Sequence, residues 1–537
     1  MNRISVAAFG TALSLLLATP ALAHEAEVDG DALQRDVTVL SHDNMEGREA
    51  GTRGYARAAG YVAGRMAALG LEPAGDDGTY FQAVPMLRVD RAEEGNALAI
   101  SGMEPLTMWE DFYVTGSSQQ ESGQLEAELV FIGYGLDLPE RDDFDGVDLD
   151  GKIALRVYGG PANLNTEEAA HYRSTLAARV AEQGAVGMLL VWTPALSNIY
   201  TWERLTGQAR HSAGMTWLNG DGTPHSDSPG LLVSGILHPD VSRALLDGLD
   251  FDYDDLVAAE MTTEKRFPSF ATGRSARIGF ASHFTRIDAP NVIGMLPGSD
   301  PSLTDEYVVL TAHLDHVGIQ PTEEEGDDEI YNGAMDNAVG VSSMIEVARL
   351  LAEHPPRRPV LFVALTAEEK GLVGSEYNAA NPTVPAEQVV ANVNLDMPIA
   401  SYAFSDVVAF GAERSNMYPQ VVAAAEEYGL TLSPDPQPEQ GFFTRSDQYS
   451  YVKQGVPAVY LDIGFGNGGE AAQGEFLSTH YHQASDEVEL VDFAALERFT
   501  GANFAIARNI ANMDERPEWN AGDFFGETFA AGTGGEH

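Results

Sequence analysis

The chain contains no cysteine in its 537 residues. Disulfide bonds are therefore excluded, and any metal site must use imidazole nitrogens and carboxylate oxygens instead of sulfur. Positive charge is also scarce, with 31 Lys and Arg residues against 81 Asp and Glu residues and a formal net charge of -50. Because an acidic surface repels phosphate backbones and anionic lipid, this balance argues against a nucleic-acid partner.

Long hydrophobic runs are absent except at the N-terminus. Residues 1–23 have the three parts of a secretory signal: the basic Arg3, the mostly apolar run Ile4–Ala18, and the small-residue cleavage site Ala21–Ala23. A membrane anchor is the alternative, but the run is short for a bilayer span of about 20 residues. The sequence therefore predicts cleavage after Ala23, a mature chain without a membrane span, and a periplasmic or secreted location.

The chain is too long for one hydrophobic core, and its composition and its pattern of predicted helices and strands change along its length. We expect a signal peptide, the first part of a main domain, a β-rich insert, the rest of the main domain and a flexible acidic, glycine-rich tail, at residues 1–23, 24–90, 91–282, 283–515 and 516–537. Strands alternate with helices in the fourth segment. This alternation predicts an α/β fold with a mixed β-sheet sandwiched between helices.

Hydrophobic periodicity places the individual elements. Helical spacing occurs at residues 33–72 (two helices separated by a polar loop at 46–52), 167–183, 341–352 and 492–513. Strand patterns occur at 129–135, 151–157, 186–192, 307–311, 359–366, 389–395 and 458–462. The strand at 359–366 is almost wholly apolar, which is typical of strands that are buried on both faces.

Five short stretches in the second half of the chain hold candidate metal ligands, several of them directly after predicted strands. They are His313-Leu314-Asp315, Asp336-Asn337, Glu368-Glu369, Asp396 and Tyr481-His482. The carboxyl ends of strands are where α/β sheets bind ligands. Two histidines and three carboxylates give each of two zinc ions three protein ligands if Asp336 is shared, with Glu368 left as a base for bound water. Calcium or magnesium would require more oxygen ligands and little imidazole.

Each stretch has an ordinary explanation when taken alone. A His-x-Asp triplet is common on surfaces, Asp336 precedes a predicted helix as an N-cap would, and adjacent glutamates often lie in a solvated loop. His316 is expected to point away from His313 if the chain stays extended. His482 is preferred to His480 because Asp486 and a loop context follow it. Only the joint occurrence favours a two-zinc hydrolase.

With these residues in view, the chain resembles zinc aminopeptidases of the M28 family over about 283–513. The segments that carry the resemblance are 312–316, 334–340, 366–371, 394–397, 445–450, 455–458 and 481–483, together with the N-terminal loop 46–52. The middle region resembles a protease-associated (PA) domain through Phe131–Gly135, Gly151-Lys152 and Gly184–Gly187. The resemblance implies a peptidase domain at 24–90 and 283–515 with a PA insert at 91–282.

The resemblance also implies the role of each site residue. His313, Asp336 and Asp396 would hold one zinc, and Asp336, Glu369 and His482 the other. Glu368 would be the general base, Asp315 the acid that orients His313, and Tyr481 the donor that stabilises the oxyanion. The peptide bond between Asp336 and Asn337 would be cis. Glu323–Glu329, an acidic stretch between the first two metal motifs, departs from the family pattern.

The function implied is that of an exported exopeptidase with two Zn²⁺ per chain, which cleaves the N-terminal bond of peptide substrates. A carboxypeptidase or dipeptidase of the same fold is the first alternative, in which Arg445 would bind a substrate carboxylate. A glutaminyl cyclase-like acyltransferase, which uses one zinc, and a non-catalytic receptor-like protein are further alternatives. The sequence leaves the oligomeric state open.

Overall fold

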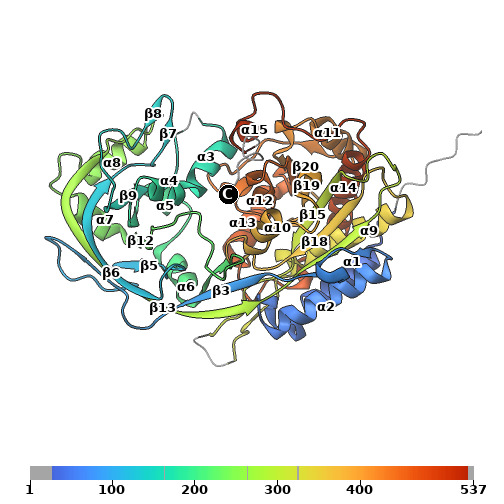
Figure 1. Cartoon of the computed structure of the whole chain (residues 1–537), viewed down its shortest axis with the longest axis horizontal. Coiled ribbons are helices and arrows are strands. Elements are labelled where there is room, and N and C mark those ends of the chain that lie inside the picture. The colour runs from blue at the N-terminus through green and yellow to red at the C-terminus, as the bar shows by residue number, and fades with distance from the viewer. Residues whose placement is uncertain (1–26, 162–163, 263, 323–325, 530–537) are drawn as a thin grey trace, which may run out of the picture.

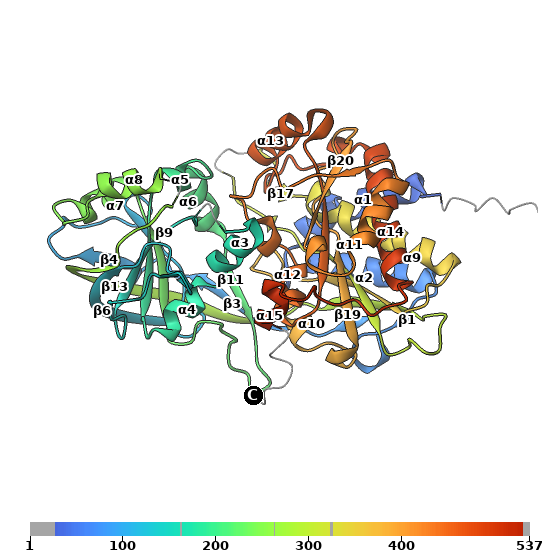
Figure 2. The ribbon, with the colours of Figure 1, turned by 90° about the horizontal axis from the view of Figure 1, so that it is seen from above.

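The computed structural model describes residues 27–161, 164–262, 264–322 and 326–529. Two lobes lie side by side, and the views in Figures 1 and 2 agree on this arrangement. The lobe on the right of Figure 1 contains the N-terminal helices and the C-terminal half of the chain, while the middle of the chain forms the lobe on the left. The signal peptide predicted at 1–23 lies outside the described residues.

The right-hand lobe is organised around a nine-stranded mixed sheet in the order β1–β14–β18–β15–β19–β22–β20–β21, with β2 paired to β14. Its strands are β1 (Glu72–Pro73), β2 (Phe81–Gln82), β14 (Asn291–Leu296), β15 (Tyr307–His313), β18 (Val360–Leu365), β19 (Val389–Asn394), β20 (Asp406–Phe410), β21 (Thr431–Leu432) and β22 (Ala458–Ile463). The four central strands, β18, β15, β19 and β22, run parallel. Their carboxyl ends therefore lie at one edge of the sheet.

Helices cover both faces of this sheet. One face packs in a continuous hydrophobic core against α1 (Gly30–Leu40), α2 (Arg53–Ala68), α9 (Val339–Glu353), α11 (Tyr418–Glu427) and α14 (Phe493–Ala511). The other face packs against α10 (Val373–Ala380) and α12 (Gln448–Lys453). Every residue of β18 is buried as a result. The predicted α/β class, with a mixed sheet between helices, is confirmed.

The left-hand lobe contains a second nine-stranded sheet in the order β11–β3–β13–β6–β9–β10–β12–β5, with β4 paired to β13. Its strands are β3 (Pro85–Arg91), β4 (Ala97–Ile100), β5 (Phe112–Val114), β6 (Ser122–Phe131), β9 (Ile153–Val157), β10 (Gly187–Val191), β11 (Gly214–Trp217), β12 (Val233–Leu237) and β13 (Phe270–Asp288). Figure 1 shows β3 and the long strand β13 running from this lobe towards the other one. The domain boundaries expected after residues 90 and 282 fall within these two strands. The assignment of this lobe as a PA domain stays a prediction.

The helices of the left-hand lobe are α3 (Thr166–Ser174), α4 (Leu176–Glu182), α5 (Pro194–Ser197), α6 (Trp202–His211), α7 (Pro239–Leu246) and α8 (Tyr253–Glu260). The single helix predicted at 167–183 is wrong, because the chain breaks at Thr175 between α3 and α4. The Thr175 hydroxyl donates to the carbonyl of His171 at 2.7 Å. Such a side-chain bond competes with the helical backbone pattern.

The C-terminal segment that we expected to be flexible is partly ordered. Residues 516–529 include α15 (Phe524–Phe529), and Phe525 is 0% exposed. The Phe525 ring lies 5.1 Å from the ring of Phe443 in the right-hand lobe and 5.8 Å from that of His171 in α3. The expectation of a loose tail is therefore wrong for 516–529, since these aromatic contacts outweigh the polar composition. The remainder, 530–537, lies outside the described residues.

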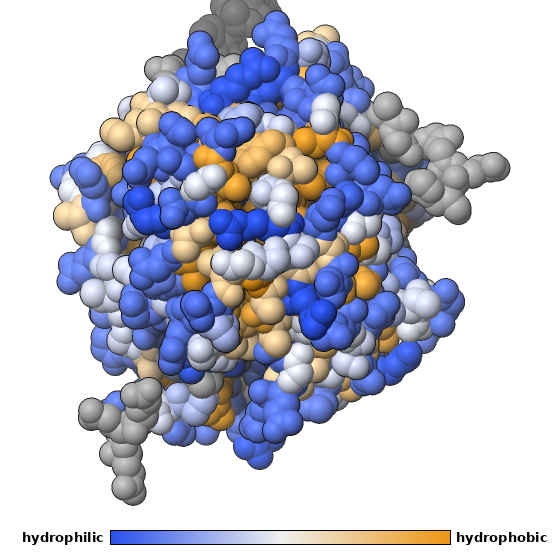
Figure 3. Space-filling model, turned by 90° about the vertical axis from the view of Figure 1, so that its left-hand side faces the viewer, coloured by the Kyte–Doolittle hydropathy of each residue, from blue (hydrophilic) through white to orange (hydrophobic). Residues whose placement is uncertain are grey.

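The surface agrees with the acidic composition. Figure 3 shows the outer face of the left-hand lobe, where hydrophilic residues predominate and hydrophobic ones are interspersed. Only three large hydrophobic side chains are exposed among the described residues: Phe81, Met261 and Ile319. Within the same residues, no helix combines the length and the apolarity needed to cross a bilayer.

Candidate metal centre

The candidate ligands converge at the edge where the parallel strands end. His313 is the last residue of β15, Glu368 and Glu369 follow β18, and Asp396 follows β19. Asp336 lies in a short helical turn (Ala334–Ala338) that leads into α9. Because neighbouring parallel strands point in the same direction, acids and imidazoles at their ends meet in space.

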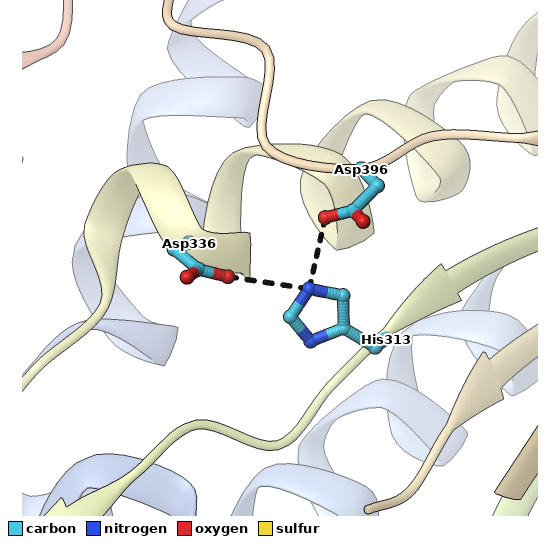
Figure 4. Close-up of side chains that lie close together, drawn as sticks. All are labelled: His313, Asp336 and Asp396. Atoms are coloured by element: carbon cyan, nitrogen blue, oxygen red, sulfur yellow. Dashed lines mark hydrogen bonds and ion pairs between the residues drawn. The ribbon is translucent and has the colours of Figure 1, made fainter. Parts of the chain in front are cut away.

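His313, Asp336 and Asp396 form the first group of ligands (Figure 4). The Nε2 atom of His313 lies 2.9 Å from Oδ1 of Asp396 and 3.2 Å from Oδ1 of Asp336. All three side chains are buried, with exposed fractions of 1%, 8% and 3% for His313, Asp396 and Asp336. Their three donor atoms point at a common centre, as a cation site requires.

A second group lies on the other side of Asp336. The Nε2 atom of His482 lies 3.3 Å from Oδ2 of Asp336 and 2.9 Å from Oε2 of Glu369. Asp336 thus presents Oδ1 to His313 and Oδ2 to His482. With one oxygen on each side, this carboxylate would be able to contribute a ligand atom to both groups.

The electrostatics of this cluster are those of a cation site. Burial alone would lower the pKa of His482, but Glu369 and Asp336 raise it to about 10. Burial would likewise raise the pKa of Asp336, but the hydrogen bonds from His313 and His482 hold it well below the usual range. The buried carboxylates therefore require positive charge beside them, which either protonated imidazoles or metal ions can supply. Imidazole with carboxylate ligands and no thiolate fits Zn²⁺.

Asp315 does not orient His313 in the way that we expected. Its carboxylate accepts hydrogen bonds from the backbone N–H groups of Glu368 (3.0 Å) and Glu369 (3.3 Å). The Nδ1 atom of His313 lies instead 3.2 Å from the backbone carbonyl oxygen of Asp315. The side chain of Asp315 therefore holds the loop that carries Glu368 and Glu369, and its backbone carbonyl holds the imidazole of His313.

The turn that carries Asp336 is anchored by Asp486, which the sequence analysis used only to choose between His482 and His480. Asp486 is buried and accepts hydrogen bonds from the backbone N–H groups of Met335 (2.9 Å) and Asp336 (3.0 Å). The Asn337 side chain accepts from the N–H groups of Gly340 and Met397, both at 3.0 Å. The peptide bond between Asp336 and Asn337 is cis, as predicted.

Arg48 ties together the backbone around both ligand loops. Its guanidinium donates to the carbonyl oxygens of Leu314, Asn332, Gly333 and Leu40, at distances of 2.6 to 2.9 Å. The side chain is only 1% exposed, and burial lowers its pKa to about 10. The sequence analysis noted the loop at 46–52 as part of the family resemblance, but it predicted no structural role for Arg48.

His316 is the residue that sequence reasoning missed most clearly. The sequence predicts only that it points elsewhere than His313 and gives it no place among the ligands, yet its ring is buried on the Glu369 side of the centre. Its Nδ1 atom lies 2.7 Å from Oε1 of Glu369 and 3.9 Å from Oδ2 of Asp336. Gly333, with a φ of +57°, makes room for the ring, since a Cβ there would lie 2.6 Å from it. The sequence feature that could have indicated this role is that His316 directly follows Asp315, just after the predicted strand at 307–311.

The remaining predicted residues line the rim of the centre. The Tyr481 ring stacks on His482 with centroids 3.9 Å apart. Burial and the carboxylates of Asp336, Glu369 and Glu368 raise the pKa of Tyr481 well above its usual value, although Arg445 opposes this. His480, the alternative to His482, is half-buried, and its Nδ1 lies 2.9 Å from the Ser485 hydroxyl.

Arg445 and Ser446 lie beside the first group of ligands. The Ser446 hydroxyl donates to Oδ2 of Asp396. Arg445 donates to the side-chain oxygen of Gln440 at 3.3 Å and lies 5.6 Å from the Phe442 ring. Arg445 therefore forms no ion pair with a carboxylate among the described residues.

The fold and the centre together define an α/β protein whose parallel strands end in a histidine–carboxylate cluster. Residues 291–507 match the model of peptidase family M28. This match lies within the segment, about 283–513, over which the sequence resembles that family.

Similar proteins agree with this family. A probable zinc metalloprotease of Pyrenophora teres f. teres is 32% identical over 125 residues, which cover 23% of this chain and 25% of that protein. A probable leucine aminopeptidase 2 of Aspergillus fumigatus is 30% identical over 249 residues, covering 43% of this chain and 46% of that protein. The match thus spans less than half the length of either curated relative.

The fold is similar to that of an aminopeptidase from Aneurinibacillus sp. strain AM-1, with a TM-score of 0.52. The superposition covers 89% of this chain and 93% of that chain at 18% sequence identity. At this identity the likeness concerns the fold alone.

Proposed function

We propose that this protein is a zinc-dependent aminopeptidase that holds two Zn²⁺ ions on either side of Asp336. The observation that carries the proposal is the position of this carboxylate, with Oδ1 facing His313 and Oδ2 facing His482. Asp396 completes the ligand set of one ion and Glu369 that of the other. The names of the family and of the similar proteins support zinc and peptide hydrolysis.

When bound, two such ions supply Lewis acidity and lower the pKa of water. Glu368 then accepts the proton of the attacking water and passes it to the leaving nitrogen. Among the described residues its side chain has no hydrogen-bonding partner, while its backbone N–H is fixed by Asp315. Burial, with the nearby Asp396, Glu369 and Asp447 carboxylates, raises the pKa of Glu368. Cations beside it act in the opposite direction and favour the ionised base.

Tyr481 acts as a hydrogen-bond donor to the developing oxyanion. Its raised pKa keeps the hydroxyl protonated across the working pH range. The surplus of carboxylates at the centre suits a substrate that brings a positive charge, which is the free α-ammonium group of a peptide. This charge balance favours an aminopeptidase over a carboxypeptidase.

The test is a comparison of substrates with the metal content measured on the same sample. The zinc-loaded protein should hold two zinc ions per chain and should cleave a leucine anilide and a C-terminally amidated peptide. It should not cleave the same peptide with a blocked N-terminus. Cleavage of the N-blocked but not the C-blocked peptide would establish the carboxypeptidase alternative. One zinc ion per chain with cyclisation of an N-terminal glutamine would establish the cyclase alternative.

The proposal includes export and a PA-like role for the left-hand lobe. Export rests on the signal pattern of residues 1–23. Expression of the full chain in a bacterial host should release to the periplasm a protein whose N-terminal sequence starts at His24. An unprocessed N-terminus in the cytoplasm would contradict the export proposal without affecting the catalytic one.

A further inference from the structure

A cleft of about 850 Å³ lies between the two lobes and reaches the metal centre. From the right-hand lobe it is lined by Glu369 and His482, among others. From the left-hand lobe it is lined by a wall of arginines and tyrosines: Arg91, Tyr113, Arg156, Tyr158, Tyr200 and Arg204. The volume lies within the range of roughly 300–1,000 Å³ that is common for ligand pockets.

The charge of this wall is opposite to that of the chain. The wall and its neighbourhood contribute three arginines and one carboxylate, Glu203, to the cleft. The whole chain has 81 acidic side chains against 31 Lys and Arg. Within the part of the chain that the structure describes, Arg91 and Arg204 donate to backbone carbonyl oxygens rather than to carboxylates. Its three arginines outnumber the single carboxylate, so among the described residues the wall is a local source of positive potential in an acidic chain.

Arg156, in β9, is the arginine of this wall that has a buried side-chain nitrogen without a hydrogen-bond partner among the described residues. Its Nε atom is buried and has no hydrogen-bond partner among the described residues. Burial lowers the pKa of Arg156 to about 10, and the ionisable groups that act on it are Tyr158 and Tyr113, not acids. A partly buried guanidinium whose Nε has no acceptor is costly, whereas a bound carboxylate would supply both a counter-charge and acceptors.

We propose that this wall binds a carboxylate of the peptide substrate on the leaving-group side of the scissile bond, with Arg156 as its anchor. The proposal rests on the aminopeptidase function proposed above, and it names the substrate class. The carboxylate is either the C-terminus of a short peptide or an Asp or Glu side chain near the cleaved bond, since both offer the same bidentate acceptor. Tyr113 and Tyr200 add aromatic surface beside it.

The first experiment uses the wild-type, zinc-loaded protein and matched peptides. Leu-Gly-Gly is compared with its C-terminal amide, and Leu-Gly-Glu-amide with Leu-Gly-Gln-amide. We expect at least one charged peptide to show a KM lower than its neutral partner by about tenfold. The pair that shows the difference identifies the source of the carboxylate. Equal KM values within both pairs would overturn the proposal.

The second experiment removes the anchor. Arg156→Met should abolish the difference in KM, and Arg156→Lys should retain part of it. The matched control is Arg277→Met, which removes an arginine that is 57% exposed and outside the cleft. Calorimetric binding of Leu-Gly-Gly to the metal-free protein gives a readout that is independent of turnover, and it should weaken in Arg156→Met alone. Unchanged discrimination in Arg156→Met would overturn the assignment.

Leucine anilide, which carries no carboxylate, separates this proposal from the proposed function. Wild-type, Arg156→Met and Arg277→Met proteins should cleave it at equal rates. If Arg156→Met lost anilide turnover in parallel, Arg156 would be a structural residue and the anchor would be refuted. If zinc-loaded wild-type protein cleaved no anilide or peptide, the aminopeptidase proposal would fail, whereas calorimetry would still report on the carboxylate site.

Discussion

At the scale of single residues, the centre depends on how each ligand is held. Asp336 faces two histidines, its backbone N–H is fixed by Asp486, and Glu369 is fixed through its N–H by Asp315. The candidate ligands were predictable because each is an acid or imidazole next to a recognisable strand or helix. The supporting roles of Asp486 and His316 were not, because they depend on the path of loops for which the sequence has no periodic signal.

Glu368 is predicted to move protons and not to bind metal. Glu368→Gln keeps the size of the side chain but removes the base, so kcat for a leucine anilide should fall by about 10²–10⁴. The zinc content and the melting temperature should stay as in wild type. The matched control is Glu387→Gln, an exposed glutamate outside the centre. Turnover within threefold of wild type would reject the role of Glu368.

Asp336 and Asp396 differ in how many ions they are predicted to hold. Asp336→Ala should lose both zinc ions, because each ion loses a ligand, whereas Asp396→Ala should weaken only the ion on the His313 side. Zinc analysis after equilibration at limiting free zinc distinguishes the two variants. Equal zinc loss in both would contradict a shared carboxylate.

Arg48 is predicted to hold the ligand loops in place. Arg48→Ala would leave four buried carbonyl oxygens without their donor. The loss should destabilise the fold by about 2–5 kcal/mol and weaken zinc binding. Denaturant unfolding and zinc titration check both effects. Arg53→Ala is the control, since that side chain is 74% exposed and pairs only at the surface. Equal stability of the two variants would contradict this role.

At the scale of elements, hydrophobic periodicity predicted the helices and strands whose positions depend on nearby residues. The helices α9 and α14 and the strands β15, β18, β19 and β22 lie where hydrophobic periodicity placed them. The ribbon of β3 and β13 was not predicted, because Met86 pairs with Ile287 across some 200 residues of sequence. The helix α15 was missed because its six residues are stabilised by contacts with distant aromatic rings.

The contact between α3, α12 and α15 should respond to acid. His171 packs among Phe524, Phe525 and Phe529, and its Nδ1 lies 2.6 Å from the Tyr449 hydroxyl. Burial lowers the pKa of His171 from 6.5 to about 4, with a smaller contribution from Arg179. The neutral imidazole is thus favoured in the folded protein. Its stabilisation is complete above pH 6.5 and is lost as the pH falls towards 4.

The size of this effect is roughly 3 kcal/mol for a shift of this kind. Thermal unfolding of wild type between pH 7 and 4 should show a decline that His171→Phe reduces. His42→Phe is the control, because His42 lies on an exposed turn. The same pH dependence in all three proteins would contradict the contribution of His171.

At the scale of the whole molecule, two lobes with separate cores enclose one cleft. One hydrophobic core belongs to the sheet that carries the metal centre, and another belongs to the left-hand lobe. The chain has a net charge of -50, yet three arginines, Arg91, Arg156 and Arg204, line the left-hand side of the cleft. The sequence predicted two domains from the change to a β-rich pattern at about residue 90. It did not predict which side chains of the second body face the first, since that depends on how the lobes dock.

The central claim is that Asp336 is shared between two zinc ions. A crystal structure of the zinc-loaded protein, with anomalous difference maps calculated from data on both sides of the zinc edge, tests it most directly. The account predicts two zinc peaks, one beside His313 and Asp396 and one beside Glu369 and His482, with a different oxygen of Asp336 coordinated to each. A single peak, or two peaks of which one lacks Asp336 as a ligand, would contradict it.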